Sequence, residues 1–207
     1  MSFSAHEDYF VRHGVLGAGS SSEAARYILE IQPSLNEVPY ESPSKYVSWL
    51  IQSCEKAGAS TSLNGGIFEL ALACVLIKEG LAPFYMSAQV QFVPNARFDL
   101  MLYSDEIGPI VLSAKTSLRE RYKQADLESQ ALRDVHRRSK TYLITLGEKE
   151  AVNVRKKIQS GDVTNLDDVI LADKPEFDSF IASLKKYTFI PGPILPTVHE
   201  GRLITLA

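Results

Sequence analysis

Cysteine, histidine and long hydrophobic runs are scarce in this 207-residue chain. The two cysteines, Cys54 and Cys74, form no metal-type pair, and we expect both to stay reduced in a cytosol. No apolar stretch approaches the roughly 20 residues that cross a bilayer, and the N-terminus carries no apolar signal core. These absences argue against a disulfide scaffold, a membrane-spanning chain and secretion. The histidines are too scattered to indicate a zinc site: His6, His13, His136 and His199.

An excess of positive charge is also missing. The formal net charge of −3 argues against a generally basic chain that coats nucleic acid without specificity. Phosphate contacts depend on a local basic face rather than on the total charge, so DNA binding requires such a face to be found. The composition, 45% hydrophobic and 23% charged, is ordinary for a globular protein with one sizeable core.

The order of the expected elements predicts an α/β fold, with a central mixed sheet flanked by helices. No repeat or linker divides the chain, so we interpret residues 1–207 as one domain, with a helical part over 1–60 and a core over 61–190. Helices are expected at 8–14, 20–32, 42–58, 63–80, 117–139, 148–159 and 175–187. Strands are expected at 84–93, 97–103, 109–116, 141–146 and 168–172, with a short strand in the C-terminal tail.

Three helix starts carry capping residues. Ser42 precedes a proline at the first helical position, and Asn64 opens the next helix. Ser117 is followed three residues later by Glu120, which is the pattern of a capping box. We therefore expect the long helix after the third strand to begin at Ser117.

A carboxylate and a lysine stand out in the hairpin formed by the second and third strands. Asp99 lies in an otherwise apolar strand, and Lys115 ends the partner strand. In a hairpin of this length the two side chains can face each other at one end of the sheet. Such a pair is either a plain salt bridge at the strand ends or part of a functional site.

Glu69 is the only charged residue between Ile67 and Ile77, in a helix segment that is otherwise apolar. Burying an unpaired carboxylate costs several kcal/mol, so a cation, a metal or a cluster of donors is expected beside it. A structural glutamate with its own donors is the alternative.

Glu128 falls on the inward stripe of the expected helix 117–139, between Leu132 and Val135 when the helix is viewed along its axis. The alternative is a structural ion pair with Arg121, which lies one heptad earlier. A divalent cation would explain three inward carboxylates and one lysine, and oxygen ligands suit a hard ion such as Mg²⁺. The chemistry implied is phosphodiester hydrolysis, with water attacking in line while the lysine orients or activates it.

The residues Phe98–Asp99, a turn, and then Ser113–Lys115 resemble the PD-(D/E)XK nuclease superfamily. The sequence has Phe98 where the family has proline, and Ser113 where it usually has an acidic residue. One branch of type II restriction endonucleases has the same Ser/Thr-x-Lys pattern and carries the displaced glutamate about a dozen residues later. Glu128 lies 13 positions after Lys115 and fits that branch.

The resemblance extends over roughly residues 64–172 as a fold pattern and over a handful of positions as a motif. It implies Mg²⁺ as cofactor, with Asp99, Glu128 and the backbone carbonyl of Ala114 as ligands. It implies Lys115 as the catalytic lysine and Glu69 as an acid that acts on the metal site through water.

Arg119, Glu120 and Arg121 follow the catalytic lysine in the sequence "RERYKQ". Restriction enzymes that read CCNGG, CCWGG and CCGG-containing sites look similar here. Arginine can donate bidentately to guanine, and glutamate can accept from cytosine, so this helix start is interpreted as the base-reading segment. A solvated first turn with Glu120 as a capping residue is the alternative. Arg121 cannot both pair with Glu128 and read a guanine.

Two further groups of residues are candidates for DNA contact. Lys45 and Trp49 have the spacing that the resembling enzymes use to hold a base extruded from the duplex, although a helical tryptophan beside apolar residues is more often core. Lys123, Arg133 and Arg137 lie opposite the apolar stripe of the long helix, where they would contact phosphates or form a merely solvated surface.

The expected function is therefore type II restriction, with double-stranded DNA as substrate and a palindromic site cut by a homodimer. A cognate DNA methyltransferase and a prokaryotic cytoplasm are implied by the resemblance. Two alternatives stay open: a repair or junction-resolving nuclease of the same fold, and a DNA-binding module without catalysis.

Overall fold

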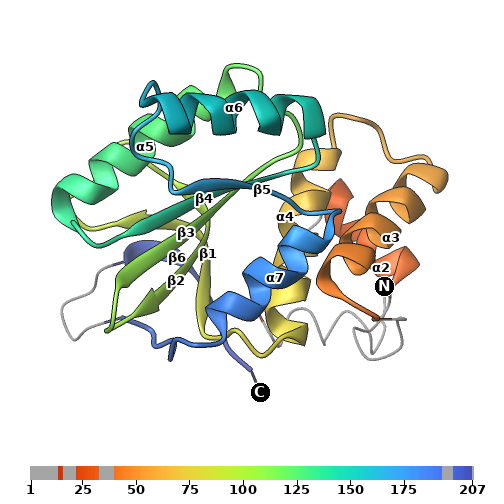
Figure 1. The fold of residues 1–207 in the computed structure, drawn as a ribbon. Coiled ribbons are helices and arrows are strands. Elements are labelled where there is room, and N and C mark those ends of the chain that lie inside the picture. Colours follow the sequence, from red (N-terminus) through yellow and green to blue (C-terminus); the bar gives the residue numbers. More distant parts are fainter. Residues whose placement is uncertain (1–13, 16–21, 33–39, 193–197, 207) are drawn as a thin grey trace.

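A six-stranded mixed sheet with helices on both faces confirms the α/β class (Figure 1). The computed structural model describes residues 14–15, 22–32, 40–192 and 198–206. The described helices are α2 (Glu23–Ile31), α3 (Pro43–Lys56), α4 (Asn64–Lys78), α5 (Arg121–Val135), α6 (Glu148–Ser160) and α7 (Pro175–Leu184). The described strands are β1 (Phe84–Val90), β2 (Phe98–Ser104), β3 (Gly108–Lys115), β4 (Lys140–Thr145), β5 (Asp168–Leu171) and β6 (Val198–Ile204).

The sheet has the strand order β5-β4-β3-β2-β1-β6. Strands β1, β2 and β3 form an antiparallel meander, which confirms the predicted hairpin between β2 and β3. Strands β4 and β5 then add in parallel beside β3, and α5 and α6 make the crossovers that parallel pairing requires. The C-terminal strand β6 returns to the other edge and pairs antiparallel with β1.

Helices α5 and α6 lie on one face of the sheet, and α4 and α7 lie on the other, with α2 and α3 packed outside α4 (Figure 1). Helix α4 is enclosed between the sheet and this outer pair, and its residues Phe68, Leu72 and Leu76 are buried in the largest core cluster. A helix enclosed in this way has no face that is fully exposed to solvent, which explains why its sequence is apolar on almost all sides.

Of the three predicted helix starts, one is confirmed and two are wrong. Ser42 caps α3, because its hydroxyl accepts the N–H of Lys45, as predicted. The prediction for Asn64 was wrong: Asn64 is already helical, and its side chain donates to Glu55 at 3.4 Å. The capping box was also wrong, because α5 begins at Arg121 and the Ser117 hydroxyl donates to Glu150 instead.

The long helix is shorter than predicted at its other end as well. It stops at Val135, whose side chain is 39% exposed rather than part of the inward stripe. The helix expected at 8–14 lies almost wholly outside the described residues. None of the described helices combines the length and the hydrophobicity needed to cross a bilayer.

Candidate active site

Asp99 and Lys115 form an ion pair at the end of the β2–β3 hairpin, as the sequence predicted. The Lys115 Nζ donates to Asp99 Oδ2 at 2.7 Å, and both side chains are more than four-fifths buried. The same Oδ2 accepts the backbone N–H of Ala114 at 2.8 Å and the Ser113 hydroxyl at 3.4 Å. Asp99 Oδ1 accepts no hydrogen bond from the part of the chain that the structure describes, so it is available to a further ligand.

The strand register explains how Asp99 reaches the backbone of β3. The β2–β3 ladder runs from Ser104↔Gly108 to Leu100↔Leu112 and goes no further. Beyond that point the N–H of Ala114 has no partner in β2, and the Asp99 side chain takes it. The N–H and C=O of one strand residue point to the same side, so the Ala114 carbonyl also faces β2. This is the side on which the resemblance predicted a metal ligand.

Glu69 enters the site from α4. Its side chain is half-buried, and burial together with the charge of Asp99 raises the pKa of Glu69 to about 7, against the opposing charges of Lys115 and Arg202. No hydrogen bond or ion pair holds its carboxylate among the described residues, so the alternative of a glutamate satisfied by its own donors finds no support in them. The structure therefore places Glu69 within electrostatic range of the Asp99–Lys115 pair.

Glu128 enters from α5, on the opposite face of the sheet. Burial raises the pKa of Glu128, while a hydrogen bond from Gln124 at 2.8 Å and the charge of Lys115 oppose the rise and Asp99 adds to it. The predicted alternative, an ion pair with Arg121, is absent within the described residues. Glu128 is thus electrostatically coupled to the same lysine and aspartate as Glu69.

Arg202 is a member of the site that the sequence analysis missed. It lies on β6, opposite Met86 of β1. Its positive charge partly opposes the rise in the pKa of Glu69 that burial and Asp99 cause. Burial in turn lowers the pKa of the Arg202 guanidinium, and Glu69 opposes this. No local pattern in the C-terminal tail marks this arginine, because only the long-range pairing of β6 with β1 brings it to the site.

The charges of this cluster are unbalanced. Three carboxylates, of Glu69, Asp99 and Glu128, face two cations, and two of the carboxylates have raised pKa values. The described residues contain no ready-made group of three His, Cys, Asp or Glu metal ligands. Mg²⁺ does not require one, because it usually binds one or two protein carboxylates and takes its other oxygens from water and substrate phosphate. The chemistry of these oxygen donors is compatible with a hard cation such as Mg²⁺.

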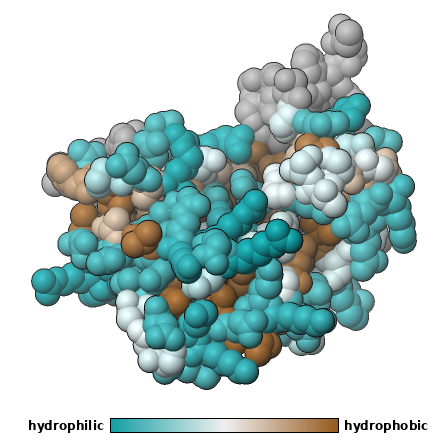
Figure 2. All heavy atoms as spheres, turned by 90° about the horizontal axis from the view of Figure 1, so that it is seen from above, coloured by the Kyte–Doolittle hydropathy of each residue, from teal (hydrophilic) through white to brown (hydrophobic). Residues whose placement is uncertain are grey.

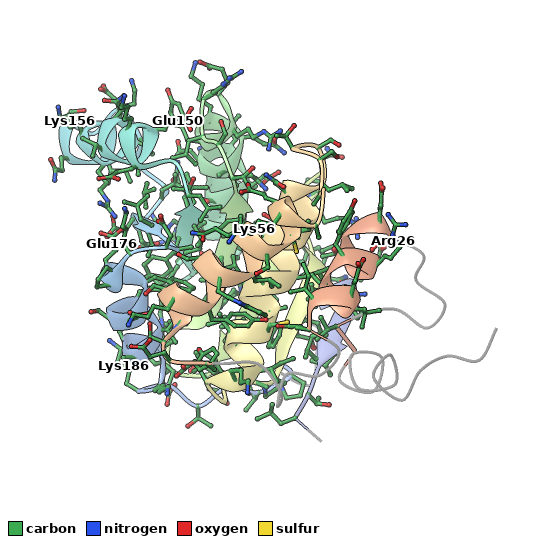
Figure 3. All side chains as sticks on the ribbon, turned by 90° about the vertical axis from the view of Figure 1, so that its right-hand side faces the viewer. Arg26, Lys56, Glu150, Lys156, Glu176 and Lys186 are labelled. Carbon is green, nitrogen blue, oxygen red and sulfur yellow. The ribbon has the colours of Figure 1, made fainter. Side chains whose placement is uncertain are left out.

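The turn before α5 carries the three residues predicted to read bases. Buried Leu118 anchors this turn. Its N–H donates a hydrogen bond of 2.6 Å to Oε2 of Glu150, a residue of α6 that is labelled in Figure 3. Arg119, Glu120 and Arg121 are all exposed, and Arg119 has a φ of 24°. Glu120 pairs with Lys123 at 2.5 Å rather than capping the helix. Base reading by these residues stays a prediction.

The three predicted phosphate contacts occupy different environments. The face carried by α5 and α6 is largely hydrophilic (Figure 2). Lys123 is exposed near the start of α5. Arg133 donates to Asp167 at 2.7 Å, so it has a structural partner. Arg137 is exposed in a surface groove beside Gly108, at the opposite end of β3 from Lys115.

Lys45 and Trp49 do not join the carboxylates. Lys45 is exposed and paired with Glu41, and Trp49 is partly buried against the core, with its ring centroid 6.0 Å from that of Tyr46. The start of α3 lies against α7, where the Ser44 N–H donates to Asp178 at 2.7 Å. The role predicted for Lys45 and Trp49 at an extruded base stays a prediction, and the packing favours the core interpretation of Trp49.

Comparison of the chain with protein-family models, with curated proteins and with solved structures found no match. We therefore infer the function from the geometry of the site and from its chemistry.

The raised pKa of Glu69 makes a prediction about stability. A carboxyl that binds its proton more tightly when folded contributes stability below its ordinary pKa of 4.5, and that stability is lost as the pH rises through about 7. We expect Glu69→Gln to stabilise the metal-free protein by about 1–2 kcal/mol near pH 8.5, after allowance for solvent screening, and by nothing near pH 4. Urea unfolding at both pH values measures this.

The matched control is Glu79→Gln at the end of the same helix. Glu79 already pairs with Lys185 at 2.6 Å and accepts the Tyr40 hydroxyl at 2.6 Å, so its replacement is expected to destabilise the protein. A Glu69→Gln protein no more stable than the parent at alkaline pH would show that the Glu69 carboxylate carries no burial cost.

Proposed function

We propose that this protein is a Mg²⁺-dependent type II restriction endonuclease, which cuts double-stranded DNA at a short palindrome with CC and GG half-sites. The observation that carries the proposal is the Asp99–Lys115 ion pair, to which both Glu69 and Glu128 are electrostatically coupled. These residues come from two helices and a hairpin, and the same four were predicted from the motif. A merely structural salt bridge needs only two of them.

Each side chain has a role that its environment supports. Asp99, Glu128 and the Ala114 carbonyl are the proposed ligands of Mg²⁺, which supplies charge neutralisation and Lewis acidity when bound. Lys115, held by Asp99 at 2.7 Å, orients the attacking water and stabilises the negative charge that develops on the phosphate. Glu69, which is electrostatically coupled to Asp99 and Lys115, would act on the metal site through water.

Sequence specificity is assigned to the exposed turn that ends at α5. Arg119 and Arg121 offer bidentate donors for guanine, and Glu120 offers an acceptor for cytosine. Arg121 makes no ion pair with Glu128, which removes the conflict between a structural and a base-reading role. The anchoring of the turn by Glu150 holds it next to the catalytic hairpin.

A palindromic site with one catalytic cluster per chain implies a two-fold symmetric homodimer. A restriction enzyme of this kind would act in the cytoplasm of a prokaryotic cell and would need a cognate DNA methyltransferase to protect the host genome. These partners follow from the proposed function.

The test is incubation of the purified protein with a sequenced plasmid and Mg²⁺, followed by mapping of the fragment ends. We expect discrete fragments, absent with a chelator, whose ends map to CC/GG sites. A smear, or cuts confined to branched or damaged DNA, would favour a repair or junction-resolving nuclease. Binding without any cleavage would favour a non-catalytic DNA-binding module.

A further inference from the structure

Arg202 is placed in the site by the register of the sheet. Arg202 pairs with Met86, Met86 pairs with Leu100, and Leu100 pairs with Leu112, so the four residues form one row across β6, β1, β2 and β3. Directly paired residues of antiparallel strands point to the same face. Met86 and Leu100 belong to the core cluster under α4, so Arg202 projects to the face that carries Glu69.

The close approach of β6 to β1 is built into the sequence. Gly201 has a φ of 155°, and a side chain there would come within 3.1 Å of the Ala88 Cα. Only glycine fits this backbone conformation and this spacing without strain. Gly201 thus lets β6 pack closely against β1, and this packing keeps the neighbouring Arg202 opposite Met86.

The guanidinium of Arg202 has donors without acceptors. Among the described residues its buried Nε has no hydrogen-bond partner, and its Nη2 has only the Met86 sulfur, a weak acceptor, at 3.5 Å. No carboxylate of the described residues lies within ion-pair distance of it. A half-buried cation with unused N–H groups is costly, and an anionic ligand relieves that cost.

We propose that Arg202 binds a non-bridging oxygen of a DNA phosphate held at the catalytic cluster. The inference rests on the proposed function. A guanidinium presents two parallel donors that match a phosphate, which a lysine cannot do. Arg202 reaches the cluster from the side of Glu69, and Lys115 reaches it from the hairpin. The phosphate is thereby held between two cations that are far apart in the sequence.

The experiment measures DNA binding in a background that does not cleave. Lys115→Ala protein, with Mg²⁺ present, is titrated with a short duplex that carries a mapped cleavage site, over a series of salt concentrations. Addition of Arg202→Ala is expected to weaken binding about tenfold or more and to reduce the slope of log K against log salt by about 1. Addition of Arg202→Lys is expected to give an intermediate loss, because it keeps the charge without the paired donors.

The matched control is Arg155→Ala in the same background. Arg155 is also a half-buried arginine, but its donors are already taken by Glu176 and the Val169 carbonyl, so binding should not change. Replacing the contacted phosphate of the duplex by a neutral methylphosphonate should weaken its binding to the Lys115→Ala protein. The same replacement should not weaken its binding to the protein that carries both Lys115→Ala and Arg202→Ala. That result would locate the phosphate.

Two contrary results are distinguishable. Unchanged affinity and unchanged salt slope in a folded Arg202→Ala or Arg202→Lys protein would overturn the role of Arg202 and leave the nuclease proposal intact. A parent protein that binds no DNA at all would overturn the proposed function, and the role of Arg202 with it.

Discussion

Lys115→Ala is expected to lower the rate of Mg²⁺-dependent cleavage by about 10³-fold or more, which corresponds to about 4 kcal/mol of lost transition-state stabilisation. The Nζ of Lys115 is the cation nearest to Asp99, and no other described lysine or arginine pairs with that carboxylate. DNA affinity should fall far less than the cleavage rate, because Arg202 and the turn proposed to read bases remain and Lys115 is already paired with Asp99. Single-turnover cleavage and equilibrium binding on the same duplex measure both quantities.

The control for this variant is Lys185→Ala. Lys185 also pairs with a largely buried carboxylate, that of Glu79, at 2.6 Å, but it lies just after α7 and away from the hairpin. Its removal should cost stability and leave cleavage by the folded protein unchanged. Equal losses of activity in the two variants would mean that Lys115 serves the fold rather than the reaction.

Glu128→Gln is expected to lower cleavage by about 10²-fold or more and to raise the concentration of Mg²⁺ needed for half-maximal activity. The substitution keeps the size of the side chain and can keep the hydrogen bond from Gln124, but it removes the charge that a hard cation needs. A titration of cleavage rate against Mg²⁺ separates weaker metal binding, which excess Mg²⁺ partly rescues, from a loss that excess Mg²⁺ cannot rescue.

Asp126→Asn provides the comparison on the same helix. Asp126 accepts the N–H of Asn165 at 2.8 Å, so it secures a loop and takes no part in the cluster. Its replacement should leave the Mg²⁺ requirement unchanged. An unchanged Mg²⁺ requirement in Glu128→Gln as well would remove Glu128 from the metal site.

Local patterns were sufficient to predict most of the fold and the pairing of Asp99 with Lys115. The alternation of helices and strands gave the mixed sheet, and the short polar turn gave the hairpin that sets Asp99 beside Lys115. Glu69 was found because a charge in an apolar helix needs a partner, and Glu128 because helical periodicity turns it inward. Each of these inferences depends on residues close in sequence or on one regular element.

The features that were missed depend on contacts between distant segments. The capping box at Ser117 failed because Glu150, more than thirty residues away, takes the N–H of Leu118. Arg133 was predicted to contact phosphate or to be merely solvated, but Asp167, the residue just before β5, pairs with it. Arg202 could not be found, because its place in the site depends on which edge of the sheet β6 joins.

The central claim is that Asp99 and Glu128, from a strand and a helix, hold one hard cation between them. Binding of Mn²⁺, a paramagnetic substitute for Mg²⁺, can be followed directly by electron paramagnetic resonance in the parent, in Asp99→Asn and in Glu128→Gln. We expect each substitution to weaken binding at least about tenfold, while Glu79→Gln leaves it unchanged. Equal Mn²⁺ affinity in all four proteins would contradict the account.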